Sequence, residues 1–299
     1  ACSQRDTSGH GTHVTGTAAG NGGGTAFRGM APRVDIAVIK PGHPTTGFNL
    51  TSDAVIDAWS YLVNLARSRN QPIVINNSFA GQFGSHDGRG AIDVTLDALA
   101  GPGVIFVVAA GNDGDEPIHT QTTSTNGGTA TIAWNHSASG RTVEPPSRSI
   151  LTAWTNPNNQ ITYNLSPPGN VTLTAEGSGA CPSNFPPTMT ATVICEDRAT
   201  GYWVTINNGP DSFTGQNVLR VQIRKDSSVG VGDTGAWSVQ AVGTSIGGNG
   251  VVDAYLGTGG NFGGGRSSSA RLRSSPGPWP SPARLTRRPP SGPTSPESL

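Results

Sequence analysis

The residues best suited to chemistry lie near the start of the chain, where His10 and His13 stand in a run of small residues, 6–20. Histidine has an ordinary pKa near neutrality, so His10 could take a proton from a hydroxyl nucleophile and return it later. Two histidines three residues apart could instead bind a metal, but the glutamate that accompanies such a pair in zinc enzymes is missing. His10 could also be structural. The small residues around it predict a helix that another backbone can approach closely, with the imidazole projecting outwards, and they favour a general base.

A second polar side chain, Asn112, follows the most apolar run of the chain, residues 104–110. An amide at the carboxyl end of a buried strand can donate a hydrogen bond to a developing oxyanion where little water competes. The Asn-Asp-Gly sequence at 112–114 is also an ordinary turn sequence. The assignment of Asn112 therefore depends on the strand before it and on the histidine segment.

These segments, together with residues 74–81, resemble parts of the subtilisin-like serine proteases. Residues 6–20 are similar to the active-site histidine signature, and residues 107–114 to the segment that ends in the oxyanion-hole asparagine. The resemblance covers residues 6 to about 116. It implies that His10 is the general base and Asn112 the oxyanion donor of an enzyme that hydrolyses peptide bonds by acyl transfer.

Residues 74–81 resemble the strand and loop that line the substrate cleft of that family. Such enzymes hold an extended polypeptide by backbone pairing along an exposed edge, with pockets for side chains. A plain exit from strand to loop would use the same residue types. The resemblance implies four substrate contacts: Ser78, Phe79, Ala80 and Gly81.

Two members of the family's catalytic triad are not recognisable in this chain. The family's aspartate lies on a strand well before the histidine motif, where only nine residues are present, and Asp6 belongs to the histidine signature itself. The Gly-Thr-Ser sequence at 243–245 ends an alternating strand and lacks the residues that follow the family's nucleophile, so Ser245 is not expected to act as one. We expect a fragment of a serine endopeptidase without turnover of its own. The alternative is a non-catalytic pseudoprotease or a β-sandwich binding protein.

The elements that position these residues alternate between strand and helix. Apolar runs at 34–40, 73–75 and 104–110 predict strands, and periodic apolar residues after Thr51 and over 91–100 predict helices. This order predicts a parallel sheet whose functional residues gather at the carboxyl ends of its strands. Residues 1–119 are therefore interpreted as a partial subtilisin-like α/β core.

Residues 120–260 change to short alternating segments, which are typical of an antiparallel β-sandwich or jelly roll inserted after the core. Cys181 and Cys195 flank a short Pro-rich stretch there, and a disulfide between them would suit an exported protein. Cys2 is left unpaired. Nine strands are expected, at residues 128–134, 149–154, 160–165, 170–176, 188–195, 202–207, 217–225, 236–242 and 250–256.

Residues 261–299 form a tail rich in Pro, Ser and Arg that is predicted to be disordered. Shifting the reading frame by two nucleotides at residues 279–284 permits an apolar-small alternation, which resembles the family strand expected after the insertion. The tail is therefore interpreted as an out-of-frame translation; its arginines could alternatively contact anions.

Charge and hydropathy exclude some classes of partner. Because six arginines and one glutamate fall in residues 266–299, the rest of the chain has 13 basic and 18 acidic residues, which argues against a nucleic-acid-binding surface. No apolar run of about 18 residues is present, so no membrane span is expected. The chemistry requires no cofactor; calcium could bind, but no metal site is identifiable. The chain begins at Ala1 and shows no signal peptide, and we expect a secreted protein.

Overall fold

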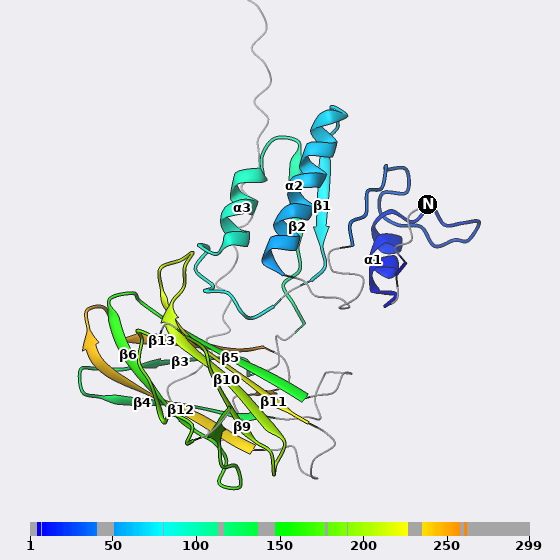
Figure 1. The fold of residues 1–299 in the computed structure, drawn as a ribbon. Helices are drawn as coiled ribbons and strands as arrows, with labels where there is room; N and C mark the ends of the chain where they lie inside the picture. Colours follow the sequence, from blue (N-terminus) through cyan, green and yellow to red (C-terminus); the bar gives the residue numbers. More distant parts are fainter. Residues whose placement is uncertain are drawn as a thin grey trace, which may run out of the picture. The chain divides into compact units, whose positions relative to one another are not determined.

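The computed structural model describes most of the first 261 residues of the 299-residue chain (Figure 1). All described residues belong to one compact unit, Ala1–Gly264. The predicted tail, residues 261–299, lies outside the described part except for its first residue. The described residues are 5–6, 8–40, 51–79, 81–112, 117–136, 147–176, 179–189, 191–226, 235–257 and 260–261.

The first element is helix α1 (His10–Ala19), which begins at the residue expected from the sequence. The segment after it covers its carboxyl end: backbone N–H groups of residues 29–31 donate to carbonyl oxygens of residues 17, 18 and 20 at 2.8–3.2 Å. A Cβ on Gly29 would lie 2.6 Å from the backbone nitrogen of Gly20, so only glycine fits. The predicted close backbone approach therefore occurs at this end. No residue of α1 is buried, however.

Two helices and two strands form the α/β part of the fold: α2 (Ser52–Ser68), β1 (Ile73–Asn77), α3 (Ala91–Leu99) and β2 (Val104–Val108). Strands β1 and β2 are parallel and pair in register from Ile73 opposite Val104 to Asn77 opposite Val108. The two predicted helices and these two predicted strands are thus confirmed. Because β1 and β2 are parallel, both of their carboxyl ends lie at the same edge of the sheet.

Both helices pack on one face of this two-stranded sheet. The apolar positions of α2 recur at helical spacing, which turns one stripe of the helix towards β1. On the other face, Val74, Ile105 and Val107 are 63%, 56% and 50% exposed. Parallel sheets normally bury both faces, and here the described residues cover one. The packed side belongs to an apolar cluster of Val55, Trp59, Leu62, Val63, Ile73, Ile75, Phe79, Ile92, Leu96, Leu99, Val104 and Phe106.

The remaining described strands are antiparallel and form two sheets (Figure 1). One has seven strands in the order β3-β13-β5-β11-β10-β9-β7, and the other has five in the order β14-β4-β12-β6-β8. The strands are β3 (His119–Thr123), β4 (Thr129–His136), β5 (Ser147–Thr155), β6 (Asn159–Ser166), β7 (Thr174–Ala175), β8 (Asn184–Phe185), β9 (Val193–Asp197), β10 (Tyr202–Pro210), β11 (Asn217–Lys225), β12 (Gly235–Ile246), β13 (Val251–Gly257) and β14 (Gly260–Asn261).

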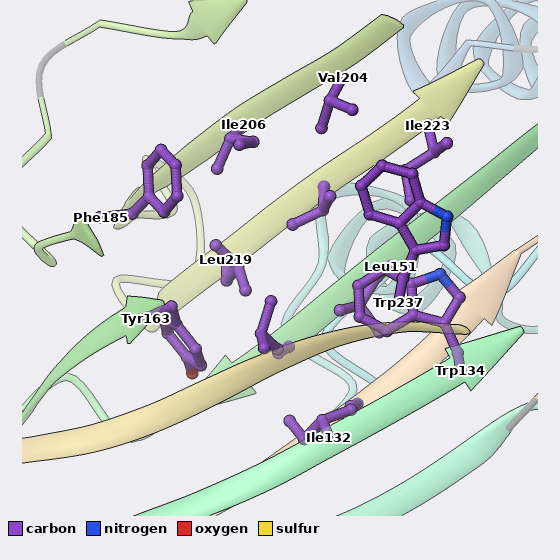
Figure 2. Packing of buried hydrophobic residues seen from close by; sticks show 14 of the residues in the cluster. Ile132, Trp134, Leu151, Tyr163, Phe185, Val204, Ile206, Leu219, Ile223 and Trp237 are labelled. Carbon is purple, nitrogen blue, oxygen red and sulfur yellow. The ribbon is translucent and has the colours of Figure 1, made fainter. Parts of the chain in front are cut away.

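The two sheets pack as a sandwich around the larger apolar core of the chain (Figure 2). Residues alternate between buried and solvent-facing along the strands, as in β6 and β12, because successive side chains of a strand point to opposite faces. Trp134 of β4 and Trp237 of β12 are directly paired across their strands, and both are fully buried. The expected disulfide joins Cys181 to Cys195 of β9, with Cα atoms 5.7 Å apart.

The structure corrects several sequence-based expectations. Residues 34–40 form no strand, and the apolar side chains of Val34, Ile36 and Val38 are more than half exposed. The strand expected over 170–176 is reduced to the two residues of β7, and that expected over 188–195 begins only at Val193. Strands β3, β8 and β14 were not predicted. Among the described residues, no helix combines the length and apolar character needed to cross a membrane.

Candidate active site

The Asp6 carboxylate holds the amino end of helix α1, where His10 lies. Its Oδ1 accepts hydrogen bonds from the backbone N–H groups of Ser8 at 3.0 Å and Gly9 at 2.8 Å. Its Oδ2 accepts from the backbone N–H of Thr12 at 2.8 Å and from the Thr12 hydroxyl at 2.7 Å. These bonds hold the pKa of Asp6 well below its ordinary value, and the bond from the Thr12 hydroxyl has the largest effect. A negative charge there also interacts favourably with the helix dipole. Asp6 thus fixes the backbone on both sides of His10.

His10 is exposed and occupies the first position of α1. Its backbone N–H donates to the Ser8 hydroxyl at 3.3 Å. Because both Asp6 oxygens are occupied by donors from residues 8, 9 and 12, Asp6 is engaged in holding the helix. That Asp6 is not the partner that would orient the imidazole remains a prediction.

A buried side-chain pair anchors the carboxyl end of β1. The indole Nε1–H of Trp59, on α2, donates to Asn77 Oδ1 at 2.7 Å, and the two residues are only 3% and 2% exposed. The Asn77 amide nitrogen donates in turn to the carbonyl oxygens of Ile75 and Val107, at 3.2 and 3.4 Å. Asn77 therefore ties α2 to both strands just before the proposed substrate segment begins.

Asn112 follows the carboxyl end of β2, as expected. The pairing of the strands extends one step further, because the Ala109 N–H donates to the Asn77 carbonyl at 3.0 Å. Gly111 then adopts a φ of 86°, a left-handed conformation that glycine reaches without strain. The chain bends at Asn112, which is exposed. An amide in this position is accessible to a ligand at the sheet edge.

The proposed substrate segment continues directly from β1. The Asn76 amide donates to the Ser78 hydroxyl at 3.0 Å, while Phe79 packs against the apolar cluster of the α/β part. Gly81 is exposed, and Ala80 lies outside the described residues. The packing of Phe79 gives it a structural role; the substrate contacts of all four residues remain a prediction.

The structure places Ser245 in strand β12, opposite Gln160 of β6 and next to an irregularity in the pairing. The neighbouring Thr244 hydroxyl donates to the Gln160 carbonyl at 3.0 Å. This serine therefore belongs to a paired strand and does not begin a helix, as expected; that it is not the nucleophile remains a prediction. Within the part of the chain that the structure describes, no hydrogen bond joins His10 to Asn112, and their gathering at the carboxyl edge of the sheet remains a prediction.

Sequence reasoning missed the positioning roles of Asp6, Trp59 and Asn77. An acidic residue shortly before a helix start is a known signal for the helix amino end, so the role of Asp6 could have been found. The polar Asn77 at the end of an apolar strand indicated a buried partner but not its identity, because Trp59 lies on another element. Among the described residues, no group of three or more His, Cys, Asp or Glu side chains could hold a metal ion.

The sequence of the chain is similar to that of known proteases. The model of the Subtilase family matches residues 2–203. The alkaline proteinase of Hapsidospora chrysogena is 29% identical over 163 residues, which are 51% of this chain and 37% of that protein. Alkaline protease 1 of Aspergillus clavatus is 27% identical over 160 residues, 50% of this chain and 36% of that protein. The chain thus spans little more than a third of the length of these relatives.

A solved structure shares the fold. The CspB protease of Clostridium perfringens matches 85% of this chain and 50% of its own chain, with a TM-score of 0.57 and 20% sequence identity. The match covers more of the chain than the α/β part alone, so the α/β elements and the sandwich occur together in that protein as well.

Proposed function

The chain belongs to the subtilase family, and from that premise we propose that the protein containing it is a serine endopeptidase acting on polypeptides. The observation that carries the proposal is the histidine segment in its folded form. His10 stands exposed at the first position of a helix whose start is held by four hydrogen bonds to Asp6. A base that must contact a substrate needs both this accessibility and this fixed backbone.

In the proposed reaction, the His10 imidazole removes the proton from a serine hydroxyl as the serine oxygen attacks the scissile carbonyl carbon. The carbonyl oxygen becomes an oxyanion, which the Asn112 side-chain amide stabilises by donating a hydrogen bond. The imidazolium then gives its proton to the leaving amine as the peptide bond breaks, which leaves an acyl-enzyme. Water hydrolyses the ester in a second cycle with the same base. The serine and the triad aspartate are assigned to sequence outside these 299 residues.

The substrate would bind along the segment that follows β1. Ser78, Ala80 and Gly81 are proposed to contact an extended polypeptide, with Phe79 holding the segment on the apolar cluster beneath it. The Trp59–Asn77 pair supports this segment from inside. We further propose that the protein is exported, because the disulfide between Cys181 and Cys195 requires an oxidising compartment to persist.

A non-catalytic pseudoprotease or sandwich-type binding protein is the second candidate. It is favoured by the placement of the one Gly-Thr-Ser sequence of the chain within paired strand β12. Nucleotide sequence on both sides of the gene segment separates the two candidates. An in-frame Gly-Thr-Ser-small-Ala-x-Pro motif beyond residue 260 supports the enzyme, and its absence supports the second candidate.

The activity test uses the protein encoded by the extended reading frame. It should hydrolyse an unfolded protein and react with a fluorophosphonate probe, whereas the 299-residue chain should do neither. His10→Ala should abolish hydrolysis, and Asn112→Ala should lower it roughly 10²- to 10³-fold, the loss measured in subtilisin itself. Ser245→Ala is the matched control and should retain full activity. Hydrolysis that survives His10→Ala would overturn the proposal.

A further inference from the structure

The loop between β1 and α3 touches the sandwich through three of its side chains. The Phe83 ring lies directly on the backbone of Gly257, at the end of β13, where a Cβ would overlap the ring. His86 stacks on Tyr255 of the same strand, with ring centroids 3.8 Å apart and planes 13° from parallel. The carboxylate of Asp87 accepts a hydrogen bond from the side-chain amide of Gln216, just before β11.

A second imidazole shares the same tyrosine. His119 of β3 pairs directly with Tyr255 across the strands, and its ring stacks on the tyrosine at 4.5 Å. The His119 Nε2 lies 3.3 Å from Asp253 Oδ1, which also accepts a hydrogen bond from Gln121 at 2.8 Å. The contact surface therefore combines two imidazole rings on one aromatic ring with the Asp253 carboxylate beside His119.

We propose that these contacts form an acid-sensitive latch, which is closed at neutral pH and releases the loop when His86 takes up a proton. The latch consists of Phe83, His86 and Asp87 from the loop, with Gln216, Tyr255 and Gly257 from the sandwich. Closure places the rings of Phe83 and His86 against Gly257 and Tyr255, and protonation of His86 places a positive charge on the ring that stacks on Tyr255 beside His119.

The charges and the partial burial around His86 favour release of the loop in acid. Partial burial lowers the pKa of His86 from its ordinary value of 6.5, and the neighbouring His119 lowers it further. A hydrogen bond with the backbone of Gln82 and the charges of Asp93 and Asp253 act the other way without outweighing the first two. The closed latch therefore binds fewer protons than the open loop. It is complete above pH 6.5 and weakens as the pH falls below that value.

Two other ionisable groups at the contact, Asp87 and Tyr255, have pKa values shifted away from this range. Asp87 has a lowered pKa despite its burial, because Ser85 and the Arg89 backbone hydrogen-bond to it and the Arg89 charge lies close. Arg89 Nε is 3.6 Å from that carboxylate. Burial and the Asp253 charge raise the pKa of the Tyr255 hydroxyl, which stays protonated. The proposal therefore rests on the change of charge of His86.

The backbone of His86 indicates that the contacts hold the loop in a set shape. Its φ of 54° is left-handed, which is uncommon for a residue other than glycine. Such a conformation persists where surrounding contacts stabilise it. The loop starts at Gly81, the last of the proposed substrate contacts, so an open latch would loosen that segment. This consequence rests on the proposed endopeptidase function; the latch itself does not.

Histidine-selective NMR on the 299-residue chain tests the latch without any substrate. In the closed state the His86 Hε1 proton should carry a ring-current shift from Tyr255, and its titration midpoint should lie below 6.5. An NOE between the Phe83 ring and the Gly257 Hα should be present at pH 7.5 and lost at pH 5. Every unit by which the His86 midpoint is depressed corresponds to about a tenfold change in the ratio of open to closed loop.

Two substitutions separate the contacts from the titration. Gly257→Ala changes no charge but displaces Phe83, so it should remove the ring-current shift and raise the His86 midpoint towards 6.5. Gly84→Ala, in the same loop, is its matched control, because a Cβ there meets no neighbour. His86→Phe keeps an aromatic ring on Tyr255 without a proton, so its Phe83–Gly257 NOE should survive at pH 5.

Three results would overturn the latch. The first is a wild-type Phe83–Gly257 NOE of equal strength at pH 5 and pH 7.5. The second is a Gly257→Ala variant whose His86 shift and midpoint equal those of Gly84→Ala. The third is loss of the NOE in acid in His86→Phe. Because no activity is measured, failure of the latch leaves the proposed endopeptidase function untouched, and the reverse also holds.

Discussion

Replacing Trp59 by phenylalanine tests whether the buried pair with Asn77 stabilises the strands that carry the proposed site. The variant keeps an aromatic ring for the edge contact with Phe106, whose centroid lies 5.1 Å away. It removes the indole N–H that donates to Asn77 Oδ1 at 2.7 Å. That oxygen is then left buried without its donor, which costs about 1–3 kcal/mol. We expect the free energy needed to open β1 and β2 to fall by this amount.

Amide hydrogen exchange of peptides from β1 and β2 measures this opening locally. Since about 1.4 kcal/mol is a factor of ten, exchange in Trp59→Phe should be roughly 5- to 150-fold faster than in the wild type. Peptides from β11, in the sandwich, report whether the rest of the fold is intact. Tyr61→Phe on the same helix is the control, because Tyr61 is 60% exposed and should change nothing.

The double variant Trp59→Phe with Asn77→Leu completes the test. With the amide removed, no unpaired Asn77 oxygen remains, so the double variant should cost less than the sum of the two single variants. Exchange of β1 and β2 that is the same in Trp59→Phe and Tyr61→Phe would refute the reasoning. Additive effects of the two substitutions would show that the pair is not coupled.

Three further predictions concern stability. The pKa of Asp6 is lowered in the folded chain, so the stabilisation it gives α1 should be complete above its ordinary value of 3.8 and lost only as the pH falls below it; NMR shifts of the Ser8, Gly9 and Thr12 amides should move together with its carboxyl carbon below that pH, and movement near neutrality would contradict this. Reduction of the disulfide between Cys181 and Cys195, 14 residues apart, should cost about 3 kcal/mol in urea unfolding of the sandwich, and an unchanged midpoint would contradict it. Tyr163→Phe should be neutral or stabilise by about 1 kcal/mol in the same assay, because the buried hydroxyl has no hydrogen-bond partner among the described residues; a clear loss of stability would contradict this.

Helices α2 and α3 could be predicted because their signals are local. The apolar residues of α2 recur every three or four positions, and Val55 and Val63 among them are buried. Thr51 precedes the helix in an extended conformation, as expected, although its side chain forms no capping hydrogen bond. Helical periodicity requires only neighbours along the chain, so a single sequence reveals it.

The strand expected at residues 34–40 fails for the opposite reason. Its apolar run satisfies the sequence pattern, but a strand exists only where a partner strand supplies hydrogen bonds, and none of the described residues pairs with it. Strand β3 shows the opposite case, in which a partner strand allows a strand to form despite a weak sequence signal. Its sequence, His119–Thr123, is polar and gives a weak signal, yet it pairs with β13 more than 120 residues later.

The sandwich illustrates a further limit of sequence reasoning. Most of its strands were predicted from their alternation, but the sheet orders were not, because nearly identical alternating segments can pair in many ways. The neighbours of β5, for instance, are β11 and β13, far along the chain. Packing of large side chains such as Trp134 and Trp237 selects among these pairings, and that information is not local.

The candidate site shows the same difference between local sequence signals and packing between distant segments. His10 is held by Asp6, four residues earlier, and Asn112 by the short β1–β2 pair, so each could be found from a motif of a few residues. Whether both can reach one scissile carbonyl depends on how α1 packs against the sheet, and that requires apolar surfaces to meet. In the described residues α1 buries no side chain, and Val74 and Ile105 on the far face of the sheet are exposed. The motifs therefore indicate a proposed base and a proposed oxyanion donor, while the distance between them depends on packing that is not formed among the described residues.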